Sequence, residues 1–584
     1  MIKNKKLFYK LITALISILC AFDLYISYRL YIMYSIIFFQ IGVVILIPLI
    51  ILAFKSYDKF KLYSDINYLK SCWPYAYDTN VDLNKVHKLY KEFGPGFLNE
   101  KDFSNVDDQT ANDLNLNDIF ESINICTSTP GEQMLYYLLR TPKLNKEDLL
   151  SRNKTIEFLS ENNDIRSELQ VIIANIGKQI KGNIFELFNT KKIVPSRAKL
   201  IFNILGTIGL IALLFMPFLG FRGFFFLFSL LLVYQFIHTK YSKEIEDEII
   251  SIGYLGNLIS AAKKISKLEC DELYNELTEL NALLEPVKNI DRNTFFVSDN
   301  DTDAIFEYIK IILLAKIRSY YSLVDTIKNN RETLVKIYSL VGKIEAYISI
   351  ASYRQRIDSY TYPNFINKDK YLKLDDAIHP LILDGVPNSI ELNKQGIILT
   401  GSNMSGKSTF MRTLGTNILL SQTIYTSLCS NYTGSFFRIL SSLSISDDVT
   451  QGKSYYLGEC NSLLRIINSI EEKTPSFCII DEIFKGTNPI ERIASSKEIL
   501  KYIMDRNALA IVATHDLELA ETCNNNYLCY YFCEDVDEEK GLTFDFKLKT
   551  GICHSGNALK LLDFLGYPKE IISNSIKSIN IDNK

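Results

Sequence analysis

The chain has 584 residues, of which 47% are hydrophobic and 22% charged, and its formal net charge is −3. At about 150 residues per domain, this length predicts three or four structural units. The charge balance excludes a globally basic nucleic-acid binder, although 64 Lys and Arg residues leave room for a local basic face. The 11 cysteines contain no CxxC pair, which favours reduced thiols over a zinc site or a disulfide framework.

The first two apolar runs, 11–28 and 31–54, are each close to the roughly 20 residues that cross a bilayer. Their connection carries only Arg29, whereas the open ends carry Lys3, Lys5, Lys6, Lys10, Lys55, Lys59 and Lys61. The positive-inside rule therefore predicts a transmembrane hairpin whose open ends face the cytoplasm. A signal peptide is the competing interpretation of the first run, but no small-residue cleavage site follows it and a second long apolar run does. Asp23 is costly in lipid, which predicts a short, tilted or paired helix.

Two further apolar runs, 201–219 and 221–238, predict a second transmembrane hairpin. Its connection carries only Arg222, and its open ends are flanked by Lys191, Lys192, Arg197, Lys199, Lys240 and Lys243. The same charge rule predicts a multi-pass protein of the cell membrane with everything else in the cytoplasm. A buried helical hairpin in a soluble core is the alternative. Two long helical patterns follow, at 242–289 and 302–356.

A phosphate-binding loop is predicted after the short apolar run "GIILT" at 396–400. Residues 401–409 match G-x-x-x-x-G-K-[ST] between a strand pattern and a helical pattern. Glycines in this loop allow successive N–H groups to point inward, and the next helix presents its positive dipole end to the phosphates. Lys407 is expected to neutralise the β- and γ-phosphates, and the Ser408 hydroxyl to bind Mg²⁺. The predicted ATP-binding residues of the loop are Gly401, Asn403, Gly406, Lys407, Ser408 and Thr409.

Carboxylates at the end of a later strand are predicted to complete the Mg²⁺ site of the nucleotide. Residues 476–480 form a continuous apolar run, typical of a central parallel strand, and Asp481 follows where ligands bind in open α/β sheets. We predict that Asp481 binds Mg²⁺, directly or through water, and that Glu482 is the general base that polarises the attacking water. A third strand, "ALAIVATHD", ends near His515. We expect His515 to sense the γ-phosphate, and the alternative is an ordinary surface or core histidine.

The segment "SISDDVTQGKSYYLGECNSLLRII" places Ser454 directly before an amphipathic helix that starts near Tyr455. Serine is a natural N-cap, and the simpler interpretation gives Ser454 this role alone. The sharper interpretation is that the N-terminus of this helix faces the γ-phosphate bound by a second subunit.

In this order, the motifs resemble the ATPase domain of the MutS mismatch-repair family. The resemblance rests on "TGSNMSGKSTFMRT", "ISDDVTQGKSYYLGE", "IIDEIFKGTNP" and "ATHDLEL", and is extended by "AIHPLIL" before them and "FKLKTGICHSGNALKLLDFLGYPKEII" after them. It implies an ATP hydrolase that uses ATP and Mg²⁺. It also implies a homodimer with composite sites, in which Ser454 acts in trans, and DNA binding in mismatch repair. An ABC transporter is disfavoured because the signature segment has no LSGGQ-like string.

A weaker resemblance lies upstream, where residues 119–159 are similar to the start of the MutS core/lever domain. The chain also departs from the family. Ser405 stands where the family usually has Gly, Phe484-Lys485 replaces the usual Gly-Arg, and "HSGNALKL" replaces the usual Ser-Tyr-Gly segment. None of these changes removes a phosphate ligand. We expect the mismatch-reading and clamp domains to be missing, and a membrane hairpin to interrupt the core domain.

The predicted fold class is an α/β P-loop NTPase domain of the ABC/MutS type, joined to an all-α core/lever domain and two transmembrane hairpins. The predicted domains are 1–60, first transmembrane hairpin; 61–110, cytoplasmic linker; 111–200, first part of a MutS-like core domain; 201–238, second transmembrane hairpin; 239–370, helical lever and second part of the core; and 371–584, MutS-type P-loop ATPase domain. Two functions remain open. One is a membrane-anchored ATPase that also binds DNA, and the other is a membrane-associated ATPase that couples ATP-driven dimerisation to its hairpins without DNA.

Overall fold

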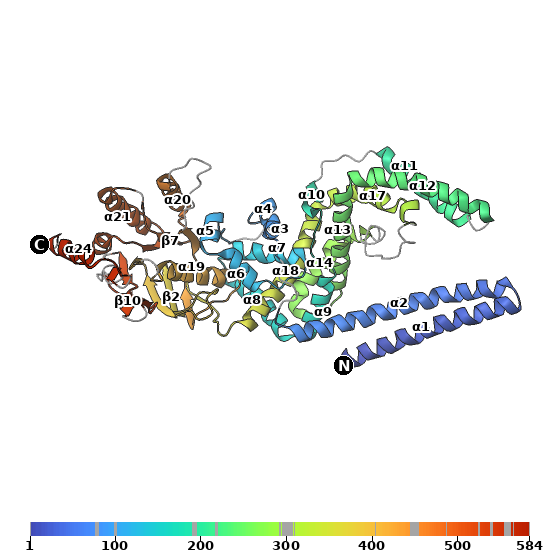
Figure 1. Ribbon diagram of the computed structural model, residues 1–584, viewed down its shortest axis with the longest axis horizontal. Helices are drawn as coiled ribbons and strands as arrows, with labels where there is room; N and C mark the ends of the chain where they lie inside the picture. The colour runs from blue at the N-terminus through green and yellow to red at the C-terminus, as the bar shows by residue number, and fades with distance from the viewer. Residues whose placement is uncertain are drawn as a thin grey trace. The chain divides into compact units, whose positions relative to one another are not determined.

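The computed structural model describes residues 2–75, 81–97, 102–189, 196–215, 220–290, 294, 308, 310–402, 405–443, 455–485, 487–523, 526–537, 541–553, 562–563 and 566–582. The chain forms two compact units, each assembled from three segments of the sequence (Figure 1). Unit 1 contains Met1–Asn80, Ile125–Met134 and Thr155–Ser352. Unit 2 contains Val81–Asn124, Leu135–Lys154 and Tyr353–Lys584. The units are therefore interleaved along the sequence.

Helices are the only regular secondary structure among the described residues of unit 1. Its helices are α1 (Ile2–Met33), α2 (Ile36–Cys72), α9 (Asn163–Ala174), α10 (Ile184–Asn189), α11 (Ser196–Phe215), α12 (Gly220–Glu244), α13 (Glu246–Ile265), α14 (Tyr274–Leu284) and α17 (Ala315–Asn329), with short 3-10 turns at Asp271–Leu273 and Glu285–Val287. Three helices contribute residues to both units: α7 (Thr129–Arg140), α8 (Lys146–Glu161) and α18 (Arg331–Arg356). This all-α part agrees with the helical region predicted from the sequence.

Helices α1 and α2 form an antiparallel hairpin (Figure 1). Small residues allow close approach, since a Cβ added at Gly42 would lie 1.8 Å from Ser27 Oγ. At the open end, Thr13 Oγ1 donates a hydrogen bond to Ser56 Oγ over 2.9 Å. Small and hydroxyl side chains at a helix–helix contact are typical of helices that pack in lipid.

The second half of α2 continues beyond this hairpin and packs on α9. Ile66 and Leu69 of α2 form a buried cluster with Val171 of α9. At the end of α2, the guanidinium carbon of Arg166 lies 3.7 Å from the centre of the Trp73 ring. One continuous helix therefore connects the apolar hairpin to the rest of unit 1.

Among the described residues, one helix is long and apolar enough to cross a membrane. It covers Lys5–Met33 of α1, its mean hydropathy is 1.9, and its most apolar window is 0% buried within the structure. The prediction of four membrane-crossing helices in two hairpins is therefore not supported. Of the other apolar helices, α11 contributes only the shorter stretch Ala198–Ala212.

The second predicted hairpin, α11–α12, has a packed side. Phe202 of α11 and Tyr234 of α12 form a buried cluster with Ile311, Leu314 and Ile317, the last of which lies on α17. The Tyr234 hydroxyl donates to the carbonyl of Leu205 over 2.5 Å. This packing is close to the soluble alternative for these runs, in which the hairpin covers a helical core.

Unit 2 is an α/β domain built on a six-stranded sheet of order β12-β9-β4-β8-β7-β6. The strands are β4 (Gly396–Thr400), β6 (Arg438–Ser442), β7 (Ser476–Asp481), β8 (Ala508–Ala513), β9 (Tyr527–Tyr531) and β12 (Lys549–Thr550). All neighbours pair in parallel except β12 with β9. Strands β4 and β8 are completely buried, as expected of central strands in a parallel sheet. This unit confirms the predicted α/β class.

Two smaller sheets complete unit 2. One has the order β1-β5-β2-β3, with β1 (Asn364–Phe365), β2 (Tyr371–Ala377), β3 (Asn388–Asn393) and β5 (Asn431–Gly434), and the other pairs β10 (Glu534–Asp537) with β11 (Gly541–Phe544). The helices of this unit are α3 (Leu83–Val86), α4 (Lys88–Phe93), α5 (Asp108–Asp113), α6 (Leu116–Ile123), α19 (Lys407–Thr423), α20 (Tyr455–Ser469), α21 (Pro489–Asp505), α22 (Leu517–Thr522) and α24 (Lys569–Asp582).

Helix α5 is attached to the sheet and to α19. The buried Asp113 carboxylate accepts hydrogen bonds from Ser441 Oγ at 2.7 Å and from the Leu443 amide at 2.9 Å. Arg412 of α19 donates from Nε to the carbonyl of Asp113 over 2.7 Å. A segment far upstream in the sequence is thus fixed to the helix that starts at the predicted phosphate loop.

Candidate functional site

The phosphate-loop residues lie between the end of β4 and the start of α19. Gly401 and Gly406 have φ angles of 134° and 109°, which favour glycine. A Cβ at Gly401 would lie 2.3 Å from the carbonyl oxygen of Phe532, so a side chain is also excluded by contact. Gly406 immediately precedes α19, whose first N–H groups have no partner within the helix and suit an anion.

The Lys407 ammonium folds over this loop. Its Nζ donates to the carbonyls of Gly401 at 2.8 Å and Ser402 at 2.6 Å. Thr409 lies in the first turn of α19, where its carbonyl accepts from Thr413 Oγ1 at 2.8 Å. Asn403, also predicted to bind ATP, lies outside the described residues. The loop therefore brings a cation and a helix N-terminus to one point, which suits a polyphosphate.

Ser408 and Asp481 form the predicted metal pair. The Ser408 hydroxyl donates to Asp481 Oδ2 over 3.0 Å, joining the start of α19 to the end of β7. A hydroxyl and one carboxylate are hard oxygen donors, and Mg²⁺ is commonly held by one or two such protein ligands together with water and phosphate oxygens. No cluster of three or more His, Cys, Asp or Glu side chains suited to a metal occurs among the described residues. These two residues therefore fit a magnesium ion shared with a bound phosphate.

Glu482 lies beside His515 at the ends of adjacent strands. His515 Nε2 is 3.0 Å from Glu482 Oε1, and Lys485 Nζ is 3.3 Å from Oε2. The hydrogen bond with His515, assisted by Lys485, holds the pKa of the Glu482 carboxyl below its usual range although burial opposes this. The side chain is therefore a carboxylate at neutral pH, with a cationic or hydrogen-bonding partner on each oxygen.

The backbone at Glu482 is in a conformation that non-glycine residues rarely adopt. Its φ is 54°, and its amide donates to the carbonyl of Ala513 in the next strand over 2.9 Å. Such angles cost roughly 1–3 kcal/mol and are concentrated at functional sites. The strand pairing at β7 and β8 maintains this angle and turns the Glu482 side chain toward His515.

An ion pair that the motifs did not predict fixes the segment after His515. Arg492 of α21 donates from Nε and Nη2 to the two carboxylate oxygens of Asp516, at 2.8 and 2.6 Å. The Asp516 amide in turn donates to Thr514 Oγ1 over 3.0 Å. No local spacing connects Arg492 with Asp516, because the contact depends on how α21 packs. The pair holds the residues on either side of His515.

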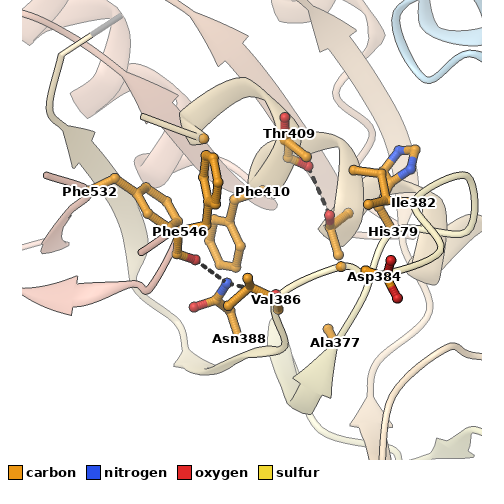
Figure 2. A pocket seen from close by; sticks show the side chains of 13 residues that line it. Ala377, His379, Ile382, Asp384, Val386, Asn388, Thr409, Phe410, Phe532 and Phe546 are labelled. Carbon is orange, nitrogen blue, oxygen red and sulfur yellow. Dashed lines mark hydrogen bonds between the residues drawn. The ribbon is translucent and has the colours of Figure 1, made fainter. Parts of the chain in front are cut away.

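A cavity of about 110 Å³ adjoins the phosphate loop (Figure 2). Its lining includes Gly406, Thr409 and Phe410 from the start of α19, and Val386, Asn388, Phe532 and Phe546 from other segments. Asn388 connects two of these segments, since its Nδ2 donates to the carbonyl of Phe546 at 2.9 Å and its Oδ1 accepts from the Leu548 amide at 2.8 Å. A cavity that is lined by aromatic rings and polar groups beside a phosphate loop suits a flat base.

The residue predicted to act in trans cannot be placed. Ser454 lies outside the described residues, and α20 begins at the next position, Tyr455. Within unit 2, Tyr456 lies 5.5 Å from Phe484 between ring centres, which brings the start of α20 to the loop after Glu482. The role of Ser454 stays a prediction.

Comparison with known proteins identifies a family for part of unit 2. Residues 397–581 match MutS domain V. The chain is 28% identical over 260 residues to a DNA mismatch repair protein MutS from Halothermothrix orenii, covering 42% of this chain and 29% of the relative. It is 28% identical over 287 residues to a DNA mismatch repair protein MSH3 from Vanderwaltozyma polyspora, covering 46% and 28%.

A longer match, with a DNA mismatch repair protein MutS from Thermotoga maritima, has 22% identity over 547 residues and covers 82% of this chain and 66% of that relative. The chain thus spans less than a third of the Halothermothrix and Vanderwaltozyma proteins. The region that matches the family model contains the phosphate loop, the carboxylates after β7 and His515. Residues 397–581 therefore match MutS domain V, which is an ATP-hydrolysing domain.

Proposed function

We propose that the protein is a membrane-anchored ATPase of the MutS type, whose site lies at the carboxyl ends of β4, β7 and β8. The observation that supports this most directly is the pair of side-chain contacts there, Ser408 with Asp481 and Glu482 with His515, each 3.0 Å long. We assign the first contact, between α19 and the end of β7, to metal binding, and the second, at the ends of the adjacent strands β7 and β8, to a base and a γ-phosphate sensor. The cavity beside Gly406 accepts the adenine base.

Each residue has a distinct part in the proposed mechanism. Lys407 and the N-terminus of α19 hold the phosphates. Ser408 and Asp481 hold Mg²⁺, which when bound supplies positive charge to the phosphate oxygens. Glu482 orients the attacking water as a carboxylate. Because His515 contacts Oε1 of the same side chain, a turn of His515 toward the terminal phosphate frees this oxygen to accept a hydrogen bond from water.

The test of the site replaces Glu482 by Gln in the full chain, purified in detergent. Loss of the base should lower the turnover of ATP by roughly 10²- to 10⁴-fold while ATP still binds. Glu498→Gln is the matched control, because this exposed carboxylate lies on α21 and contributes no described contact to the site. Turnover that stays within tenfold of the parent in the Glu482 variant would show that the base has been assigned to the wrong residue.

The composite homodimer is the second part of the proposal. Its support is the family of unit 2 and the position of α20, which starts next to Ser454 and reaches the loop after Glu482. With ATP bound, the Glu482→Gln variant should elute as a dimer from a sizing column in detergent. A Ser454→Ala exchange in that background should return it to the monomer position. An elution volume that ATP does not change would reject ATP-driven dimerisation.

Membrane anchoring by α1 and its partner α2 is the third part. The apolar window of α1 is 0% buried, whereas a core helix of a soluble protein is mostly covered. Exposed side chains along it include Leu11 at 62%, Leu15 at 59% and Ile18 at 66%. Such a continuous apolar surface marks contact with lipid or with protein. The lysines at the open end of the hairpin support a cytoplasmic location of unit 2 by the positive-inside rule.

Flotation with phosphatidylcholine vesicles tests the anchor. Leu15→Glu together with Ile18→Glu should prevent the full chain from floating, because each carboxylate costs several kcal/mol in a bilayer centre. Ile180→Glu, at an equally accessible position of unit 1 that is 80% exposed, should leave flotation unchanged. Equal flotation of the double variant and the parent would reject insertion of α1.

Whether the protein binds DNA distinguishes the two proposed functions, a DNA-binding membrane ATPase and a membrane ATPase without DNA binding. The relatives are named DNA mismatch repair proteins, which supports a DNA-binding role. A salt titration of binding to homoduplex, heteroduplex and branched DNA decides between them. A DNA-binding protein must lose affinity steeply as salt rises, with a slope of about −0.9 for each phosphate contact. If no salt-dependent affinity is found, the membrane ATPase without DNA binding is the remaining function.

A further inference from the structure

At the open end of the α1–α2 hairpin, the lysine-rich ends of the two helices lie side by side, at the same height along the hairpin axis. Thr13 of α1 is hydrogen-bonded to Ser56 of α2, and the rings of Tyr9 and Tyr63 are stacked with centres 5.7 Å apart. Toward the closed end, Ser27 meets Gly42. These contacts define an antiparallel register in which residues 5–13 lie beside residues 55–63.

Six lysines occupy this level, and we call them the basal lysines: Lys5, Lys6, Lys10, Lys55, Lys59 and Lys61. Five of them are exposed, and Lys6 is half-buried. None forms an ion pair within the part of the chain that the structure describes. Asp58 and Asp65 are the acidic residues of the neighbouring sequence, so the charge of this level is strongly positive.

Aromatic rings hold several of these ammonium groups against the hairpin. Lys59 Nζ lies 5.2 Å from the centre of the Tyr9 ring and 3.4 Å from its hydroxyl. Lys5 lies 5.8 Å from the centre of the Tyr63 ring, and Lys6 lies 6.0 Å from that of Phe60. A cation–π contact orients an ammonium without neutralising it, so its N–H groups stay available to an anion. Tyrosine and lysine together are typical of the polar edge of a bilayer.

The distance along the helix places this level at lipid headgroups. Residues 11–28 of α1 rise about 27 Å at 1.5 Å per residue, close to the roughly 30 Å of bilayer hydrocarbon. An apolar segment of this length that is embedded in lipid leaves the basal lysines at the adjoining phosphate layer. The opposite end of the hairpin carries a single basic residue, Arg29. The asymmetry concentrates the positive charge on one leaflet.

We infer that the basal lysines form a binding surface for anionic phospholipid headgroups. This inference rests on the proposed insertion of α1 and α2. Each lysine near an anionic surface contributes about fivefold in affinity at low salt. The headgroup phosphate accepts hydrogen bonds from the ammonium groups, while the Tyr9 and Tyr63 rings fix where those groups lie. The partner is therefore an anionic lipid rather than a neutral one.

The test uses the only tryptophan of the chain, Trp73, as an energy donor. Trp73 lies directly after α2, about 18 Å along the helix from Lys61. The full chain is reconstituted into phosphatidylcholine vesicles that contain a trace of dansyl-labelled phosphatidylglycerol or dansyl-labelled phosphatidylcholine. Energy transfer to each probe reports its local concentration. We expect several-fold more transfer to the anionic probe, and an excess that disappears in 1 M salt, where the Debye length is about 3 Å.

Matched variants distinguish binding of anionic headgroups from insertion of the hairpin into the bilayer. Lys5→Gln, Lys10→Gln and Lys59→Gln together remove half of the basal lysines and should lower the excess of transfer to the anionic probe several-fold. Lys264→Gln, Lys267→Gln and Lys336→Gln remove three exposed charges elsewhere in unit 1 and should leave the excess intact. Equal transfer to both probes from the parent overturns the headgroup surface and leaves insertion standing. Absence of transfer to either probe overturns the insertion, and the inference with it.

Discussion

Replacing Glu345 by Gln should remove a pH dependence from the stability of unit 1. Glu345 lies on α18 and is buried. Its Oε1 accepts hydrogen bonds from the amide of Thr127 at 2.7 Å and from its hydroxyl at 2.8 Å, and Oε2 accepts from the Ser128 hydroxyl. Burial raises the pKa of the Glu345 carboxyl from its ordinary value of 4.5 to about 7, although these hydrogen bonds oppose the rise.

The sign and the size of the effect follow from this pKa. Between pH 4.5 and about pH 7 the folded protein keeps a proton on Glu345 that the unfolded chain has lost, so the free energy of unfolding falls as pH rises. Each pKa unit corresponds to about 1.4 kcal/mol, so the full loss is about 3 kcal/mol by pH 8. Below pH 4.5 the contribution is fully present.

The surroundings of Glu345 accommodate a glutamine side chain. Glu132 raises the pKa of Glu345 further, and Lys178 lies 2.9 Å from Glu132. A Cβ at Gly131 would lie 2.0 Å from Glu345 Oε2, so the space admits the native side chain or one of its shape. Glutamine has that shape. Its amide oxygen can accept from both donors of Thr127, and its NH₂ group can donate to the Ser128 hydroxyl.

Urea unfolding of the full chain in detergent, at pH 5 and at pH 8, measures this effect. Trp73 belongs to unit 1, where it stacks on Arg166, so its fluorescence reports the unfolding of that unit. We expect the two proteins to have similar stability at pH 5, and the Gln variant to be more stable by about 3 kcal/mol at pH 8. If the difference between the two proteins has the same value at both pH values, the Glu345 carboxyl is not the titrating group and the argument fails.

Three further predictions concern unit 2. Asp481→Asn should raise the Mg²⁺ concentration needed for half-maximal ATPase activity by roughly tenfold or more, measured by magnesium titration. Arg492→Ala should lower kcat by ~10- to 100-fold with little change in KM, because it frees the segment around His515, and Arg492→Lys should restore part of the rate; an effect on KM alone would contradict this role. Phe546→Ala should weaken ATP binding by about 1 to 3 kcal/mol in calorimetry through loss of base stacking, without altering the binding of inorganic triphosphate.

The sequence was most informative where the site is built from consecutive residues. The phosphate loop needs two glycines in unusual backbone conformations followed by Lys407 and Ser408, so its spacing alone locates it. Asp481 and His515 end buried apolar strands, and parallel strands bring their carboxyl ends to one edge. The sequence pattern alone is therefore sufficient to group the residues at these strand ends.

Other parts of the site depend on contacts that no local pattern records. Asn388 and Phe546 are hydrogen-bonded across 158 positions of sequence, and Arg492 reaches Asp516 only because α21 packs beside β8. The hydrophobicity of α11 and α12 also has two explanations, since a helix that covers a core and a helix in lipid have similar compositions. Phe202 and Tyr234 pack against the residues before and within α17, whereas Ile204 and Phe225 are more than half exposed, and no composition separates these two sides of the hairpin.

Helix α2 is a single helix from Ile36 to Cys72 with Pro48 inside it, and its 37 residues span about 55 Å. One end of this helix is fixed by Ile66, Leu69 and the Arg166–Trp73 stack. A rotation of about 5° at the fixed end would displace the other end by several ångströms, roughly 5 Å over the full length. Reorientation of the helices packed on the end of α2 would therefore be amplified into a tilt of the hairpin. With the hairpin inserted as proposed, deformation of the bilayer would act back on those helices through the same lever arm.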